Sequence, residues 1–220
     1  MPIEAEPLVE RLGLVASGEE STWTGELDDR PVVAVVTGMG TVFAHEGTTR
    51  LLDTYDVDRV VVVGITGALE NDTPIGTLIR PAVVLNSETG EEFTPEPFGS
   101  QTPHGTMWTT NVITPRDRLP GLLERGVVSL DMETAAIAKV CEARGIPWAV
   151  FRTISDRASD GTVTEEVFKL SNQDGTPNHE AIAEYFTKHP EAAERMAEMG
   201  KNVQLAVEAA ATAAIEACRA

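Results

Sequence analysis

Acidic side chains suited to proton transfer gather in the segment from Leu130 to Ala158. Asp131 and Glu133 open a stretch with helical periodicity, and Ser155 and Asp156 follow an apolar stretch further along the chain. Carboxyl groups can act as general acid and general base when their surroundings adjust their pKa values. We therefore expect the chemistry of this protein to reside in this segment, with the rest of the chain as its scaffold.

The first element of the segment is a predicted helix. Small and apolar residues recur from Met132 at the three-and-four spacing of a helix with one buried face. Gly145 and Pro147 end the pattern, as expected of residues that stop helices. Asp131 takes the N-cap position and Glu133 lies in the first turn, so both acids are placed at the positive end of the helix dipole. Asp131 is interpreted as a cap, whereas Glu133 suits either a surface position or a binding site.

The second element is a predicted buried strand at 148–151, Trp148 to Phe151. Arg152, Ser155 and Asp156 follow it. Ligands of open α/β sheets bind beyond the carboxyl ends of the strands. These polar groups therefore mark a candidate binding edge, although Ser155 and Asp156 would equally suit the start of a loop.

Composition indicates one soluble α/β domain spanning residues 1–220, because 220 residues with 42% hydrophobic content can form a sizeable core. Cys141 and Cys218 are the two cysteines, and their spacing predicts neither a disulfide framework nor a metal site. We expect a cytoplasmic protein without metal or cofactor. A net charge of −18 argues against nucleic acid or an anionic membrane as partner.

Further elements follow from hydrophobic patterning. A hairpin is predicted from strands on either side of Asp28 and Asp29, and helices are predicted at the two ends of the chain. The segments expected to be helical are 1–14, 41–55 and 190–217, and those expected to be strands are 23–27, 32–36, 59–63, 76–85 and 105–114. The turn T-G-M-G at 37–40 also fits a dinucleotide-binding fold, but Phe43 stands at the third glycine position, so that signal is weak.

Several blocks in order resemble one known family. D-M-E-T-A-A-I-A at 131–138 and F-R-T-I-S-D at 151–156 are similar to the paired signature of the purine nucleoside phosphorylase and nucleosidase superfamily. M-P-I-E-A-E-P-L at the start resembles its first active-site loop, and V-V-V-V-G-I-T-G-A-L at 60–69 resembles its glycine-rich turn. The resemblance covers residues 1–160 and is closest to the 5'-methylthioadenosine/S-adenosylhomocysteine nucleosidases. In that family a strand precedes the first loop; either upstream residues supply it here or another part of the sheet replaces it.

The resemblance implies an α/β three-layer phosphorylase/hydrolase-like fold with a central mixed β-sheet. It also implies a purine nucleosidase, an N-glycosyl hydrolase that acts on a small-molecule purine nucleoside as a homo-oligomer, dimer or higher. By the resemblance Asp156 is the acid at the purine N7, steadied by Ser155. Glu133 holds the ribose hydroxyls, and Glu4 activates the water.

The remaining site residues also come from the resemblance. Met132 packs on the sugar and Arg152 orients the carboxylates. The glycine-rich turn contributes Thr66 and Gly67 to substrate binding, and Ile113 takes the place of the aromatic residue that stacks on the purine.

Two alternatives stay open. A phosphorylase would need cationic donors for phosphate, and Val62 and Ile65 stand where the family's phosphorylases place an arginine and a serine. A non-catalytic nucleoside-binding protein is the other alternative, suggested by the absent first strand, Ile65 and Ile113.

Overall fold

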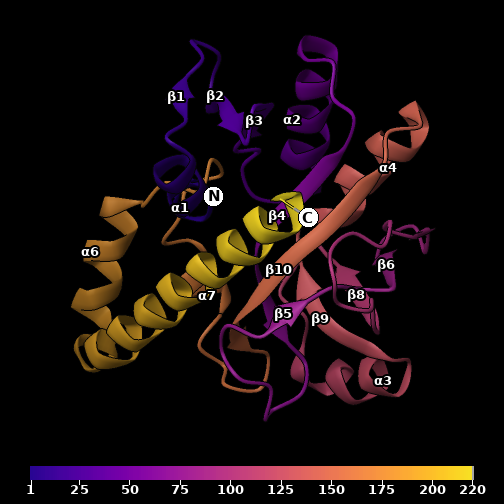
Figure 1. Ribbon diagram of the computed structural model, residues 1–220. Helices are drawn as coiled ribbons and strands as arrows, with labels where there is room; N and C mark the ends of the chain where they lie inside the picture. The colour runs from indigo at the N-terminus through magenta and orange to yellow at the C-terminus, as the bar shows by residue number, and fades with distance from the viewer. Residues whose placement is uncertain (220) are drawn as a thin grey trace.

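The structure is a computed structural model that describes residues 1–219. A mixed sheet of seven strands lies between layers of helices, with a separate sheet of three strands beside it (Figure 1). The large sheet has the order β5-β10-β4-β9-β8-β6-β7. Its strands are β4 (Val60–Ala68), β5 (Leu78–Ile79), β6 (Val83–Asn86), β7 (Glu92–Phe93), β8 (Thr106–Thr109), β9 (Val127–Asp131) and β10 (Trp148–Arg157).

Pairing in the large sheet is both parallel and antiparallel. Strand β10 runs parallel to β4, and β8 runs parallel to both β6 and β9. The β4–β9 pair is antiparallel, as are the edge pairs β5–β10 and β6–β7. The predicted central mixed sheet is confirmed.

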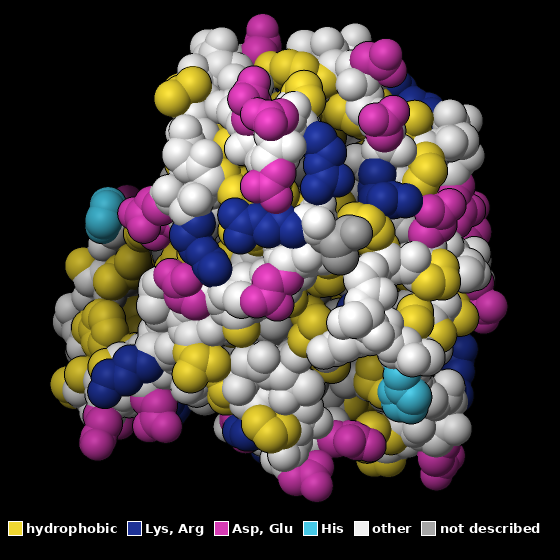
Figure 2. All heavy atoms as spheres, in the orientation of Figure 1, with side chains coloured by type: hydrophobic (Ala, Val, Ile, Leu, Met, Phe, Trp, Pro, Cys, Tyr) yellow, Lys and Arg dark blue, Asp and Glu magenta, His cyan; other side chains and the backbone are white. Residues whose placement is uncertain are grey.

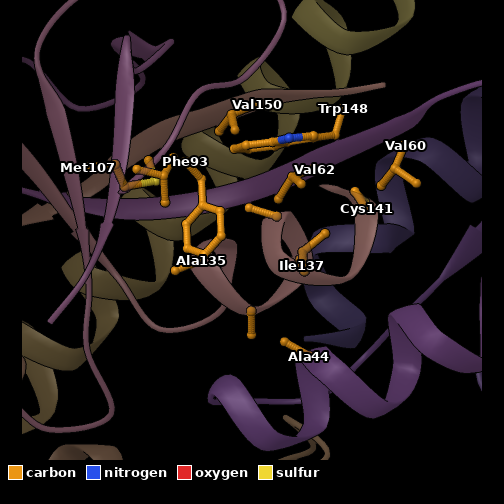
Figure 3. Packing of buried hydrophobic residues seen from close by; sticks show 13 residues of the cluster. Ala44, Val60, Val62, Phe93, Met107, Ala135, Ile137, Cys141, Trp148 and Val150 are labelled. Carbon is orange, nitrogen blue, oxygen red and sulfur yellow. The ribbon is translucent and has the colours of Figure 1, made fainter. Parts of the chain in front are cut away.

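Side chains of β10 alternate between the two helical layers, as a pleated strand requires. Trp148 and Val150 pack in a cluster with residues of α4 (Thr134–Arg144), shown in Figure 3. Ala149 and Phe151 pack instead against the end of α7 (Ala193–Arg219), which crosses the other face of the sheet in Figure 1. Because both faces of β10 are covered, its first residues read as a continuous apolar run rather than an alternating one.

The other helices complete the layers. Helix α2 (Thr41–Thr54) packs on α4, and α1 (Pro2–Leu12) packs on both α7 and β4. The predicted helices at 1–14, 41–55 and 190–217 thus exist with slightly different ends, and the three-layer arrangement is confirmed. The shorter helices are η1 (Arg116–Arg118), α3 (Leu119–Glu124), α5 (Glu165–Phe168), α6 (His179–Lys188) and η2 (Pro190–Ala192).

Several strand predictions were wrong at their ends. The strand expected at 76–85 is two strands on opposite sides of the sheet, because β5 pairs with β10 whereas β6 pairs with β8. Pro81 lies between them and cannot donate a ladder hydrogen bond. The strand expected at 105–114 is confined to β8, and the strand expected at 59–63 continues as β4 through the glycine-rich turn.

The small sheet holds β1 (Val15–Ala16), β2 (Thr22–Leu27) and β3 (Arg30–Val35) in antiparallel order. Asp28 and Asp29 both have positive φ, 50° and 63°, as in the tight hairpin turns that match strand twist. The predicted hairpin is confirmed. The valines of β3, expected to be buried, are only half-buried because this sheet has no place in the central one.

The surface reflects the acidic composition. Figure 2 shows acidic side chains spread over the whole of one face, whereas Lys and Arg side chains gather mainly in its upper half. Within residues 1–219, no helix is long and apolar enough to cross a membrane.

Candidate active site

Arg152 is the centre of a buried group of polar side chains. It lies on β10 opposite Gly64 of β4, and its side chain is 6% exposed. Its Nη1 donates to the carbonyl oxygen of Ile65 at 2.7 Å, its Nε to Thr134 Oγ1 at 3.0 Å and its Nη2 to Glu133 Oε2 at 3.0 Å. Burial alone would lower the pKa of Arg152, but the surrounding carboxylates outweigh it and raise that pKa. The guanidinium therefore stays charged and orients its partners.

Glu133 lies directly before α4, with a carboxylate held from two sides. Its Oε2 accepts from Arg152, and its Oε1 accepts the N–H of Gly40 at 2.9 Å. Gly40 has φ 91°, a conformation that side chains rarely adopt, and it precedes α2. Burial raises the pKa of Glu133, Arg152 and the Gly40 N–H oppose the rise, and Asp131 and Glu4 add to it.

Glu4 reaches the same group from α1. Its Oε1 accepts the Ile65 N–H at 2.9 Å and lies 3.7 Å from Arg152 Nη1, and its Oε2 pairs with the terminal ammonium of Met1. Burial would raise the pKa of Glu4, but the ammonium, Arg152 and the Ile65 N–H lower it overall. A Cβ at Gly64 would lie 2.3 Å from Glu4 Oε1, so the glycine makes room for this carboxylate.

Ser155 and Asp156 form a second group further along β10. Ser155 Oγ donates to Asp156 Oδ1 at 2.7 Å. The β10–β4 register shifts between Ile154 and Asp156, which brings Asp156 opposite Gly67. A Cβ on Gly67 would lie 3.2 Å from Asp156 Oδ2. Burial raises the pKa of Asp156, the Ser155 hydrogen bond lowers it, and Asp160 raises it further.

A cavity of about 410 Å³ opens beside Asp156, within the range of small-molecule sites. The first residues of α7 form its opposite wall. It is lined by Ser155, Asp156, Arg157, Asp160, Thr162, Glu191, Glu194, Arg195, Glu198, Met199 and Asn202. Among the expected site residues, only Ser155 and Asp156 line this cavity.

The other expected residues have different surroundings. Thr66 is buried and its hydroxyl donates to the Leu130 carbonyl at 2.7 Å, so it links β4 to β9. Met132 is half-buried between β9 and α4. Ile113 is half-buried in the segment after β8, close to Asn111, whose side chain caps the N–H of Thr41 at 2.9 Å.

Two boundaries expected from sequence are corrected. Asp131 ends strand β9, and α4 begins at Thr134 with Glu133 in the N-cap position. Asp131 nevertheless accepts the Thr134 N–H at 2.7 Å, which fulfils the role of a cap from outside the helix. Strand β10 runs to Arg157, so Ser155 and Asp156 lie in its last residues rather than beyond its end.

Sequence reasoning missed several members of the group. Thr109, Thr134 and the backbone N–H of Gly40 bind the acids, yet none was expected to do so. Only Thr134 left a signal, because it stands three residues after Asp131, the spacing at which a cap oxygen meets a backbone N–H. Among residues 1–219, no group of three or more His, Cys, Asp or Glu side chains is arranged to hold a metal ion.

A mixed sheet in which an arginine in the middle of β10 gathers carboxylates from α1 and from the end of β9, with a further carboxylate near the end of β10, defines an α/β protein of the phosphorylase/hydrolase-like fold. Residues 1–109 and 98–203 match the family model of the Phosphorylase superfamily, and the chain belongs to this family. The resemblance expected from the sequence blocks is thereby confirmed.

Relatives of this chain include two bacterial 5'-methylthioadenosine/S-adenosylhomocysteine nucleosidases. The protein from Chromohalobacter salexigens is 28% identical over 171 residues, which cover 61% of this chain and 71% of that protein. The one from Actinobacillus succinogenes is 28% identical over 174 residues, which cover 66% of this chain and 75% of that protein.

Solved structures share the fold. The 5'-methylthioadenosine/S-adenosylhomocysteine nucleosidase of Neisseria meningitidis with methylthio-immucillin-A has a TM-score of 0.73 at 17% identity and covers 100% of this chain and 95% of its own. The futalosine hydrolase of Helicobacter pylori has a TM-score of 0.71 at 16% identity, with 100% and 94% covered. At such identities the likeness establishes the architecture alone.

Proposed function

We propose that this protein is a nucleosidase that hydrolyses the N-glycosidic bond of a purine ribonucleoside of the methylthioadenosine or adenosylhomocysteine kind. One observation carries the proposal: three carboxylates share Arg152, while Asp156 lies in a second group, paired with Ser155, and has a raised pKa. Reactions that need an acid and a base at one pH are served by carboxyl groups in such different environments. The nucleosidases among its relatives support the same reaction.

Asp156 is the general acid in this mechanism. Its raised pKa keeps a proton on the carboxyl group closer to neutral pH, and Ser155 fixes the other oxygen by donating to Oδ1. Asp156 gives its proton to the purine N7 as the electron pair of the glycosidic bond moves onto the base. The base then leaves as a neutral molecule and the ribosyl group becomes an oxocarbenium-like cation. In this mechanism the cavity beside Asp156 receives the purine base, and Gly67 and Ile113 contribute to binding it.

Glu133 and Glu4 serve the sugar side. Glu133 accepts hydrogen bonds from the ribose hydroxyls, and Met132 packs on the ribose ring. Thr66 supports this side of the site by linking β4 to β9. Glu4 keeps its charge because its pKa is lowered, so it orients a water and accepts the proton as the water oxygen bonds to the ribosyl carbon. The products are free purine and a ribose derivative.

Hydrolysis is favoured over phosphorolysis because the groups that could bind phosphate, Arg152 and the backbone N–H of Ile65 in the glycine-rich turn, already bind carboxylates. Arg152 is surrounded by carboxylates, and the Ile65 N–H donates to Glu4. Val62, at the place of the phosphorylase arginine, is buried in the hydrophobic core. Phosphate requires cationic and N–H donors, and Glu4 would repel it.

The experiment is a panel of purine nucleosides incubated with and without phosphate, followed by separation of the products. A free ribose derivative in both conditions supports the nucleosidase. Ribose 1-phosphate that forms only with phosphate would identify a phosphorylase. Purine nucleoside that is retained but never cleaved would identify a non-catalytic binding protein.

We further propose that the protein is cytoplasmic and acts as a homo-oligomer, dimer or higher. Both cysteines are free thiols, which suits a reducing compartment. Val42 and Val112 are 63% and 66% exposed next to Thr41 and Asn111, which hydrogen-bond to each other beside the site. Sedimentation equilibrium of the wild type tests the assembly, and a monomer at micromolar concentration would refute it.

A further inference from the structure

Asp131 makes more hydrogen bonds than a helix cap needs. Its side chain is 0% exposed at the end of β9. Oδ1 accepts the Thr109 hydroxyl at 2.6 Å, and Oδ2 accepts the Thr134 N–H at 2.7 Å and the Thr134 hydroxyl at 2.6 Å. A cap uses one side-chain oxygen for one or two backbone N–H groups. Both oxygens of this carboxylate are in use.

Two further contacts of Asp131 act on Glu133. Oδ2 accepts the backbone N–H of Glu133 at 3.1 Å and lies 3.2 Å from Arg152 Nη2. The same Nη2 donates to Glu133 Oε2 at 3.0 Å. Asp131 therefore fixes Glu133 twice, through the backbone that carries its side chain and through the guanidinium that holds its carboxylate.

The threonines close the network. Thr109 Oγ1 accepts the Ala135 N–H at 3.1 Å as well as donating to Asp131, so it ties β8 to the first turn of α4. Thr134 Oγ1 accepts from Arg152 Nε at 3.0 Å while donating to Asp131. Buried networks in which each group has its partner hold one geometry, because any other arrangement leaves a polar atom unpaired.

We propose that Asp131, assisted by Thr109 and Thr134, is a positioning residue that aims the Glu133 carboxylate at the ribose hydroxyls. The inference rests on the proposed function, since it assigns Glu133 to the sugar. Asp131 touches no substrate and acts only through Glu133 and Arg152. Its loss should weaken recognition of the 2'-hydroxyl and leave protonation of the base by Asp156 in place.

The test compares kcat/KM for a purine ribonucleoside with kcat/KM for its 2'-deoxy counterpart, in wild type, Asp131→Asn and Thr109→Val. The deoxy substrate lacks the hydroxyl that Glu133 holds, so damage to Glu133 affects it less. We expect the ribo-to-deoxyribo ratio to fall by about tenfold in both variants, the scale of one hydrogen bond to a charged group. Thr109→Ser keeps the hydroxyl and should retain the wild-type ratio.

Each outcome decides a separate question. An unchanged ratio in folded Thr109→Val and Asp131→Asn would overturn the positioning role, even if both substrates react more slowly. If Asp131→Asn does not fold, because its amide would face donors at Thr134 and Arg152, Thr109→Val alone decides. A wild type that releases no purine from any nucleoside would refute the proposed function itself.

Discussion

Replacing Asp156 by asparagine removes the proposed proton donor and changes little else. The amide has nearly the same volume, and its oxygen still accepts from Ser155 Oγ, 2.7 Å away in the wild type. Opposite Asp156 lies Gly67, which has no side chain to clash with the new group. We therefore expect Asp156→Asn to fold and to retain the cavity.

The size of the effect follows from the role proposed for Asp156. General acids contribute about 10² to 10⁴ in rate, and burial has raised the pKa of this carboxyl group, as such a role requires. The turnover of natural purine nucleosides by Asp156→Asn should thus fall by at least about a hundredfold. The turnover of a 4-nitrophenyl riboside, whose leaving group needs no proton, should fall much less in the same variant.

The assay measures purine release and nitrophenol release by both proteins at several pH values. Asp72→Asn, an exposed acid in the turn after β4, is the matched control and should behave as wild type on both substrates. Equal losses on the two substrates would indicate damage to the site rather than a missing proton. Purine release within threefold of wild type would remove Asp156 from the mechanism.

Glu4→Gln should lower turnover about a hundredfold, whereas substrate binding, measured by calorimetry, should persist because Glu133 and Asp156 remain. The control is Glu6→Gln, an exposed acid on the same helix, which should turn over substrate as the wild type does. Unchanged turnover in Glu4→Gln would place water activation elsewhere. Arg152→Met leaves buried carboxylates unpaired and should lower the free energy of unfolding, measured in urea, by about 3–5 kcal/mol. The control Arg144→Met removes a surface ion pair and should lower it by less than ~1 kcal/mol. A loss that small in Arg152→Met would contradict the prediction. Because folding raises the pKa of Asp156 above 3.8, its stabilising contribution is present at low pH and is lost as pH rises through the folded pKa. Asp156→Asn should accordingly gain unfolding free energy relative to wild type as pH rises from about 3 to 7, and a constant difference would disprove the raised pKa.

Local patterns in the sequence predicted the elements better than their ends. The run at 148–151 identified β10, but the strand continues to Arg157 because β4 and β5 pair with its later, more polar residues. Likewise, the strand expected at 76–85 is divided because its halves have different partners. Strand ends depend on partners far away in the chain, which periodicity along one segment does not contain.

The candidate site shows the same division. Four site residues were expected from the segment at 130–158. The structure divides them into two pairs: Arg152 with Glu133, and Ser155 with Asp156. Asp131 was interpreted as a cap because its neighbours in sequence suggested nothing else. Its bond to Thr109 crosses from β9 to β8 and has no local signature.

By itself, the sequence determined the class of fold and the family, because four blocks of residues in order resemble one superfamily, and it named most of the acids of the proposed mechanism through the same resemblance. Only the tertiary structure decided the surroundings of each acid. In the folded chain the Ile65 N–H donates to Glu4, for which Gly64 leaves space, and Arg152 pairs with three carboxylates. The fold also places the half-buried Asp156 beside the cavity with Ser155 and Asp160 rather than Arg152 as its neighbouring polar groups, so the pKa of Asp156 rises while that of Glu4 falls. The physical reason is that a carboxyl group's pKa depends on burial and on charges within a few ångströms, which the folded chain alone brings together.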